Sequence, residues 1–274
     1  MAGSGQRGGL APGPAGTGPG WAGRGAASPA GLSGWALLEE AVWRQAPGLS
    51  APVPGRTGEC DVCRGPLRTA SRCYPCAEQA ESLPGLLADA VVPVCFAPKG
   101  GLHTRNLWLY KSGQAGAGAA RLALLALLAV FLRDHAACVW AAAGMASPTH
   151  VAVVPSGRGR PGPHPLRALA GPLTGLPWAE LTVAWPRDPA ARIADPGRYQ
   201  AAPLPGARVA VLDDTWTTGA SAQSAAAALR RAGAQSVAVI VLGRHLLPEP
   251  GLPAFEMGRC AVHRCPAPAG RPGQ

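Results

Sequence analysis

The segment Arg208-Val-Ala-Val-Leu-Asp-Asp-Thr-Trp-Thr-Thr-Gly-Ala-Ser221 places two adjacent carboxylates directly after an apolar run. The run 209–212 predicts a buried strand, and residues 222–232 have the composition of a helix. A second apolar run at 237–242 completes a strand–helix–strand unit. Alternating strands and helices of this length predict an α/β fold, with a mostly parallel sheet flanked by helices.

The loop between the first strand and the helix has the composition of a phosphate site. Consecutive backbone N–H groups at residues 217–220 can converge on one phosphate at the positive end of the helix dipole. Gly219 lets the main chain come close to a ligand, and the loop hydroxyls add donors. The candidate substrate-binding residues of this loop are Thr215, Thr217, Thr218, Gly219, Ala220 and Ser221.

The acidic pair, Asp213 and Asp214, lies about a ribose length from that phosphate position. Carboxylates placed there can accept hydrogen bonds from a sugar diol, as the acidic residue of a dinucleotide fold does. The competing interpretation is an ordinary buried strand that ends in a capped turn. Capping needs one Asp or Ser, not this whole set of residues, so a site for a phosphorylated ribose is favoured.

This segment resembles the phosphoribosyl diphosphate signature of type I phosphoribosyltransferases, in which four apolar residues precede two acids and a Thr-Thr-Gly loop. The resemblance implies that Asp213 and Asp214 are the catalytic pair and hold the ribose 2′- and 3′-hydroxyls, while the loop holds the 5′-phosphate. It also implies phosphoribosyl diphosphate as the substrate, bound with Mg²⁺, which takes a carboxylate or two together with substrate oxygens. Trp216 departs from the family pattern, where that position is commonly aliphatic or small.

A second constellation is formed by Cys60, Cys63, Cys73 and Cys76, two CxxC pairs separated by nine residues. Two such knuckles can close a tetrahedron of thiolates around one Zn²⁺, a structural site. The polar segment between them cannot bury a core, so metal binding would supply the folding energy. Structural disulfides are the alternative, disfavoured in a reducing cytoplasm, and a redox CxxC is less favoured still.

The remaining cysteines carry weaker signals. Cys95 and Cys138 lie in apolar surroundings, which predicts core positions. Cys260, His263 and Cys265 resemble half of a metal site, but they lie in a Pro- and Gly-rich tail without a fourth ligand.

Composition divides the chain into five parts. We expect a disordered leader at 1–33, a helix and linker at 34–57, a zinc-ribbon-like module at 58–80, a phosphoribosyltransferase-like domain at 81–246 and a flexible tail at 247–274. The net charge of +10 favours anionic ligands, but the arginines are scattered, unlike a dedicated nucleic-acid patch. With no signal peptide and no apolar run long enough to span a bilayer, we expect a cytoplasmic protein without a membrane partner.

Periodicity and turn residues predict the remaining elements. Helices are predicted at 35–43, 78–90 and 165–173, together with a long helix that opens at Lys111-Ser-Gly113 and reaches Asp134. Strands are predicted at 149–154 and 181–185. The apolar stretches 91–97 and 107–110 flank Pro98-Lys-Gly-Gly101, which predicts a hairpin at the sheet edge.

Tyr110-Lys111-Ser112-Gly113 resembles a turn that precedes a helix in the ComF/GntX group of phosphoribosyltransferase-like proteins. The resemblance implies that Lys111, Ser112 and Gly113 hold the leaving diphosphate; the competing interpretation of Lys111 is a solvated surface lysine. The cysteine module, this turn, the Val-Pro-Ser strand end and the acidic signature follow the ComF order over about 58–244. The Arg-Gly-Phe-Asn-Gln sequence usual in ComF proteins is missing here. Residues 157–164 form a basic, Gly/Pro-rich loop instead. This loop either reaches a diphosphate through Arg158, Arg160 and His164 or has no ligand role.

Two functions follow from these resemblances. The first is a phosphoribosyltransferase that transfers the phosphoribosyl group to an unknown nitrogenous acceptor, in nucleotide metabolism or salvage. The second is a non-catalytic, ComF-like accessory in DNA uptake or processing, which senses nucleotides or binds single-stranded DNA or a helicase partner.

Overall fold

The computed structural model describes residues 34–52, 58–67, 70–156, 163–184, 192–246, 258–259 and 266–267. The predicted leader at 1–33, the arginines of the 157–162 loop and the Cys260, His263 and Cys265 group lie outside the described residues.

A four-stranded, fully parallel sheet forms the centre of the molecule. Its strands lie in the order β2 (Ala90–Pro98), β7 (Ser236–Leu246), β6 (Arg208–Trp216) and β3 (His150–Val153). The predicted α/β class with a mostly parallel sheet is therefore confirmed. Because all four strands run the same way, their carboxyl ends meet at one edge of the sheet.

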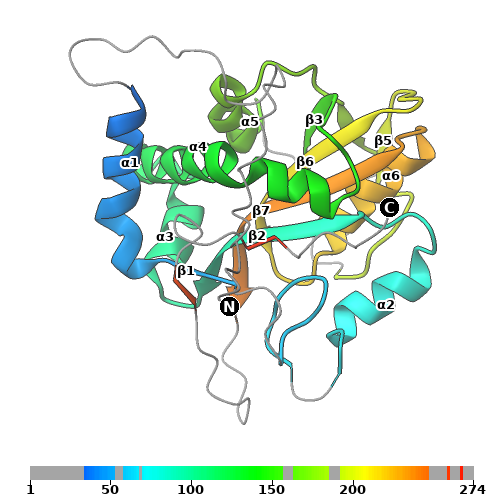
Figure 1. Cartoon of the computed structure of the whole chain (residues 1–274), viewed down its shortest axis with the longest axis horizontal. Coiled ribbons are helices and arrows are strands. Elements are labelled where there is room, and N and C mark those ends of the chain that lie inside the picture. Colours follow the sequence, from blue (N-terminus) through cyan, green and yellow to red (C-terminus); the bar gives the residue numbers. More distant parts are fainter. Residues whose placement is uncertain are drawn as a thin grey trace, which may run out of the picture.

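Helices α3 (Leu102–Leu109), α4 (Ala117–Ala142) and α5 (Pro165–Ala170) cover one face, with a 3-10 turn, η2 (Gly171–Leu173), after α5. Helix α1 (Gly34–Gln45) packs on the outer side of α4 (Figure 1). Val42 of α1 is buried there with the α4 residues Ala126 and Val130. Among the described residues, α4 alone is long and apolar enough to cross a bilayer, and 56% of its most apolar window is buried inside the protein. Such burial is what the core helix of an α/β domain requires.

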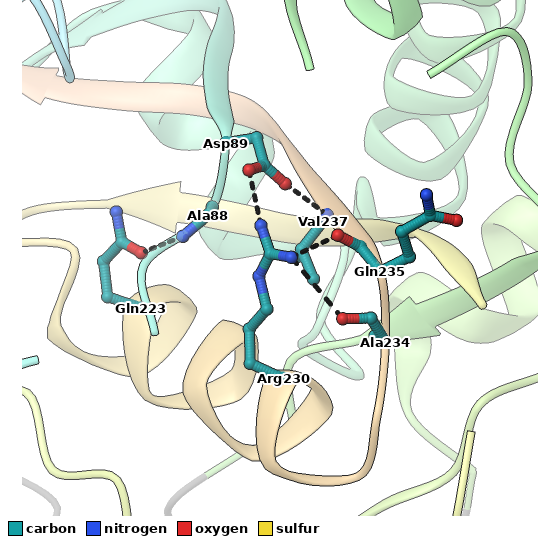
Figure 2. Close-up of polar contacts among 7 residues, drawn as sticks. All are labelled: Ala88, Asp89, Gln223, Arg230, Ala234, Gln235 and Val237. Atoms are coloured by element: carbon teal, nitrogen blue, oxygen red, sulfur yellow. Dashed lines mark hydrogen bonds and ion pairs between the residues drawn. The ribbon is translucent and has the colours of Figure 1, made fainter. Parts of the chain in front are cut away.

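Helix α6 (Ala220–Arg231) covers the opposite face and follows β6 directly. Its last turn is attached to the start of β2 through an ion pair between Arg230 and Asp89, whose second carboxylate oxygen accepts from the Val237 amide at 2.7 Å (Figure 2). One turn after the helix begins, the Gln223 side chain accepts from the Ala88 amide at 3.0 Å (Figure 2). These contacts fix both ends of α6, so the loop at its amino end is held against the sheet.

The hairpin predicted over 91–110 is wrong, because 102–109 forms helix α3. Gly101 precedes this helix, and the Pro98 carbonyl accepts from both the Gly101 amide and the Thr104 hydroxyl. His103 and Leu107 are buried with helical spacing, and β2 already has a parallel neighbour in β7. The buried face of 102–109 therefore repeats every three to four residues, a period that a strand does not satisfy.

Smaller elements surround this core. Strands β4 (Leu181–Val183) and β5 (Tyr199–Ala201) form a separate antiparallel pair, so the strand predicted at 181–185 lies outside the main sheet. Strand β1 (Ser50–Ala51), which follows the 3-10 turn η1 (Ala46–Gly48), pairs with β8 (Gly258–Arg259).

Three further predictions need correction. Helix α2 (Tyr74–Ser82) begins at the second cysteine pair instead of at residue 78, and α4 begins at Ala117 and runs past Asp134. Cys95 is buried as predicted, but Cys138 is exposed, because it lies on the outer face of α4 while Ala136 and Val139 face inward.

Candidate functional site

The acidic pair lies at the carboxyl end of β6, on the edge of the sheet where ligands bind in open α/β folds. Asp214 is buried and accepts a short hydrogen bond from the Tyr110 hydroxyl. Its carboxylate also forms an ion pair with the Lys111 ammonium at 2.7 Å. The Lys111 side chain is 28% exposed and is held by this ion pair, which a freely solvated surface lysine would not be.

The two carboxylates differ in electrostatic environment. Burial, followed by the neighbouring Asp214 carboxylate, raises the pKa of Asp213 to about 7. Burial alone would also raise the pKa of Asp214, but the Lys111 charge and the hydrogen bonds from Lys111 and Tyr110 outweigh it and lower the pKa. Asp214 is therefore an ionised group already satisfied by protein partners, whereas the raised pKa of Asp213 favours its protonated form.

The loop after β6 turns sharply over Trp216. Gly219 has a φ of +87° immediately before α6, a conformation that favours glycine. A Cβ at this position would overlap the Trp216 indole ring, and Trp216 is only 1% exposed. The unusual tryptophan is thus a buried support beneath the loop, and a side chain at 219 is excluded by both conformation and space.

The loop carbonyls point toward other protein groups. The Thr218 carbonyl accepts from the Gln79 amide at 2.7 Å, and the Thr217 carbonyl accepts from an Arg244 guanidinium nitrogen at 3.1 Å. The Thr218 hydroxyl donates to the Arg192 carbonyl at 3.2 Å. Within the described part of the chain, the amides at 217, 218, 219 and 221 donate to no protein group. These N–H groups, at the positive end of α6, can accept an anion.

Three residues that sequence reasoning missed lie around this edge. Arg198 donates to the Ser221 hydroxyl at 3.1 Å, and Tyr199 donates to the Pro155 carbonyl at 3.3 Å. Burial, aided by the charges of Arg244 and Lys111, lowers the pKa of His245. No sequence motif marks these residues. Arg198 and Tyr199 lie just before and at the start of β5, and His245 lies near the end of β7, so only the fold brings them to the loop.

The Lys-Ser-Gly turn lies between α3 and α4. The Ser112 hydroxyl donates to the Leu109 carbonyl at 2.8 Å and so closes the end of α3, and Gly113 is exposed. Thr215 lies within β6, paired with Gly243 of β7. The structure therefore brings Lys111 to the acidic pair, while Ser112 has a local role in the turn.

The basic loop is described only at its end. His164 caps α5 by accepting from the Leu166 amide at 3.2 Å. Arg158 and Arg160 lie outside the described residues, so their role in binding a diphosphate stays a prediction.

The four cysteines come together as predicted. The Sγ atoms of Cys60, Cys63, Cys73 and Cys76 all lie within 4.8 Å of one another, and those of Cys63 and Cys73 are 3.7 Å apart. All four are free thiols and three of them are buried. These separations suit a tetrahedral thiolate site, in which Zn–S bonds of about 2.3 Å place the sulfurs about 3.8 Å apart.

The four thiols share protons when no metal is bound. Hydrogen bonds among them lower the pKa of Cys60 and raise those of Cys73 and Cys76, so a metal would release protons as it binds. A divalent cation stabilises all four thiolates at once. The cluster can therefore hold a metal such as Zn²⁺, and its closed set of four ligands is typical of a structural site.

Comparison with known proteins adds little. No family model and no curated protein sequence matches this chain. Among solved structures, the chain has a slight similarity to a purine phosphoribosyltransferase from Pyrococcus horikoshii Ot3, with 17% identity, a TM-score of 0.24 and coverage of 40% of this chain and 81% of that one. A similarity this slight assigns neither fold family nor activity.

Proposed function

We propose that this protein is a type I phosphoribosyltransferase-like, ComF-like enzyme that binds phosphoribosyl diphosphate with Mg²⁺ and transfers the phosphoribosyl group to a nitrogenous acceptor. One observation carries the proposal: the acidic pair and a loop with unused amides are continuous at the carboxyl end of β6. A phosphate and a ribose diol attached to it need these two groups of partners side by side. Free thiols in a metal-binding arrangement suit a reducing compartment, so we propose a cytoplasmic location.

Different residues bind different parts of the ligand. The loop amides at 217, 218, 219 and 221 bind the 5′-phosphate, and Arg198, already at the Ser221 hydroxyl, adds positive charge nearby. Asp213 accepts hydrogen bonds from the ribose hydroxyls, because Asp214 is already engaged by Tyr110 and Lys111. Carboxylate and diphosphate oxygens are the ligands that Mg²⁺ prefers, and the ion supplies positive charge to the diphosphate when it is bound.

The reaction needs position and electrostatics more than covalent help from the protein. The bond between the anomeric carbon and the diphosphate oxygen breaks, and the electron pair leaves with the diphosphate. Lys111 neutralises part of that charge by turning from Asp214 toward the diphosphate, which leaves the ionised Asp214 carboxylate without its counter-charge beside the developing cation of the sugar ring. The lone pair of the acceptor nitrogen forms the new bond, and the nitrogen releases a proton to solvent.

Calorimetric titration with phosphoribosyl diphosphate and Mg²⁺ tests the binding step. We expect Asp213→Asn combined with Asp214→Asn to abolish binding, while Glu40→Gln, on the exposed face of α1, leaves it unchanged. Pyrophosphate release with a panel of nitrogenous bases then tests turnover. Equal binding by the double variant and the wild type would refute the proposed roles of the acidic pair.

The non-catalytic alternative remains a separate proposal, supported by the net charge of +10. A basic protein attracts polyanions, and single-stranded DNA binding would weaken steeply with salt. DNA binding that survives the Asp213→Asn/Asp214→Asn change, without pyrophosphate release from any base, would favour this accessory role in DNA uptake or processing, alone or with a helicase partner.

A further inference from the structure

The anion loop, residues 217–219, is held from behind by two side chains outside the signature, the buried Gln79 and the partly buried Arg244. The Gln79 amide nitrogen donates to the Thr218 carbonyl at 2.7 Å. Arg244 donates to the Thr217 carbonyl at 3.1 Å and to the Trp216 carbonyl at 3.4 Å. Gln79 belongs to α2 and Arg244 to β7, so two distant segments meet at consecutive peptides of the loop.

These contacts set the direction of the loop amides. In a trans peptide the C=O and the following N–H point in opposite directions. Because the Thr217 carbonyl points toward Arg244, the Thr218 amide points away from it; in the same way, the Gly219 amide points away from Gln79. Within the described residues neither amide has a protein acceptor. The two side chains therefore hold open the two donors that a phosphate would use.

Both side chains are tied to the four-cysteine cluster. Gln79 is 3% exposed and lies one turn after Cys76, a cluster member in the first turn of α2. Arg244 lies against the first cysteine knuckle, where a Cβ on Gly65 would be 2.6 Å from the guanidinium. A Zn²⁺ ion with four thiolates carries a net charge of about −2, which favours a guanidinium beside it.

We infer that Gln79 and Arg244 are positioning residues that couple the metal-loaded cysteine module to the anion loop, so that metal occupancy sets the affinity of the loop for its phosphate. This inference rests on the proposed function, which supplies the ligand. The cysteine module then forms part of the ligand site, because Gln79 and Arg244 connect it to the peptide groups of Thr217 and Thr218.

The chain offers a matched control for each residue. Gln45 is 6% exposed and donates to a backbone carbonyl, that of Ala123, at 2.9 Å, but it lies on α1. Arg208 donates to the Ser147 carbonyl at 2.6 Å from the opposite end of β6. Replacement of each by Met removes a donor of the same kind at a site away from the loop.

The experiment compares Gln79→Met and Arg244→Met with Gln45→Met and Arg208→Met in the full chain with its metal. We expect Gln79→Met to weaken phosphoribosyl diphosphate binding by about tenfold, the loss expected for one buried hydrogen bond, at unchanged zinc content. Hydrogen exchange of the Gln223 amide, which donates to the Gly219 carbonyl at 2.9 Å and so reports on the loop, should accelerate without ligand in the same variant and in chelator-treated wild type. This rate is the loop exchange. The control variants should alter neither the affinity nor the loop exchange.

Each outcome is decisive for one of the two proposals. If the wild type binds the ligand and Gln79→Met and Arg244→Met match it in both affinity and loop exchange, the inference is overturned. If the wild type does not bind the ligand, the proposed function fails, while loop exchange still tests the positioning role. Should Arg244→Met not fold, Arg244→Lys and Gln79→Met supply the same comparison.

Discussion

Replacement of Gly219 by alanine is the sharpest test of the loop geometry. The backbone at this position has a φ of +87°, and a Cβ would overlap the buried Trp216 ring. Two costs therefore add: about 1–2 kcal/mol for a left-handed alanine and about 1–3 kcal/mol for overpacking. We expect Gly219→Ala to lower the free energy of unfolding by about 2–5 kcal/mol.

The two costs can be separated with variants from the same chain. Gly144 has a φ of +66° with open space around its Cβ position, so Gly144→Ala measures the conformational cost alone. Trp216→Leu removes the overlap but leaves a cavity, at a cost of about 2–4 kcal/mol. In the double variant Gly219→Ala/Trp216→Leu the alanine methyl enters that space, so the double loss should fall short of the sum by about 1–3 kcal/mol.

Urea denaturation followed by circular dichroism measures all four variants. The predicted order is a small loss for Gly144→Ala, a large loss for Gly219→Ala and a sub-additive loss for the double variant. Strictly additive losses at 216 and 219, or equal losses for the two alanine variants, would refute the contact between Trp216 and the loop.

Further predictions concern protons and metal. The pKa of Asp213 is raised to about 7 in the folded protein, so folding favours its neutral form. Its ionisation therefore lowers the free energy of unfolding as pH rises from about 4 to 7. Between pH 6 and 8 ligand affinity should rise by about tenfold more in the wild type than in Asp213→Asn, which retains only the titration of the ligand itself; parallel profiles would contradict this. Elemental analysis should find one zinc per chain, lost in Cys76→Ser together with several degrees of melting temperature; an unchanged metal content would exclude the four-cysteine site. Lys111→Met leaves the Asp214 charge without its ion-pair partner, so ligand-free stability should fall by about 3 kcal/mol in urea denaturation, and an unchanged midpoint would contradict the ion pair.

Local sequence patterns predicted the centre of the fold. The apolar runs that end at Leu212 and Leu242 are both buried parallel strands, because a strand covered on both faces is apolar throughout. The four cysteines were equally predictable, since their spacing alone allows the sulfurs to converge.

The errors have a common physical origin in tertiary context. Residues 102–109 were predicted as part of a hairpin because Pro98-Lys-Gly-Gly101 has turn composition, but the parallel partner of β2 comes from β7, far along the chain. Cys138 has apolar neighbours in the sequence, yet the rotation of α4 turns it outward.

The residues that hold the loop in place could not be identified from sequence motifs either. Gln79 and Arg244 contact the loop carbonyls across long sequence separations. No fixed spacing links such residues to the signature, so only the folded chain identifies them.

Titration of isotopically labelled protein with ribose 5-phosphate, followed through backbone amide chemical shifts, tests the central claim most directly. The account predicts that the largest shifts occur at Thr217–Ser221 and that the Gly219 amide moves downfield as it binds the phosphate. Shifts confined to other parts of the molecule, with these amides unmoved at saturating ligand, would contradict it.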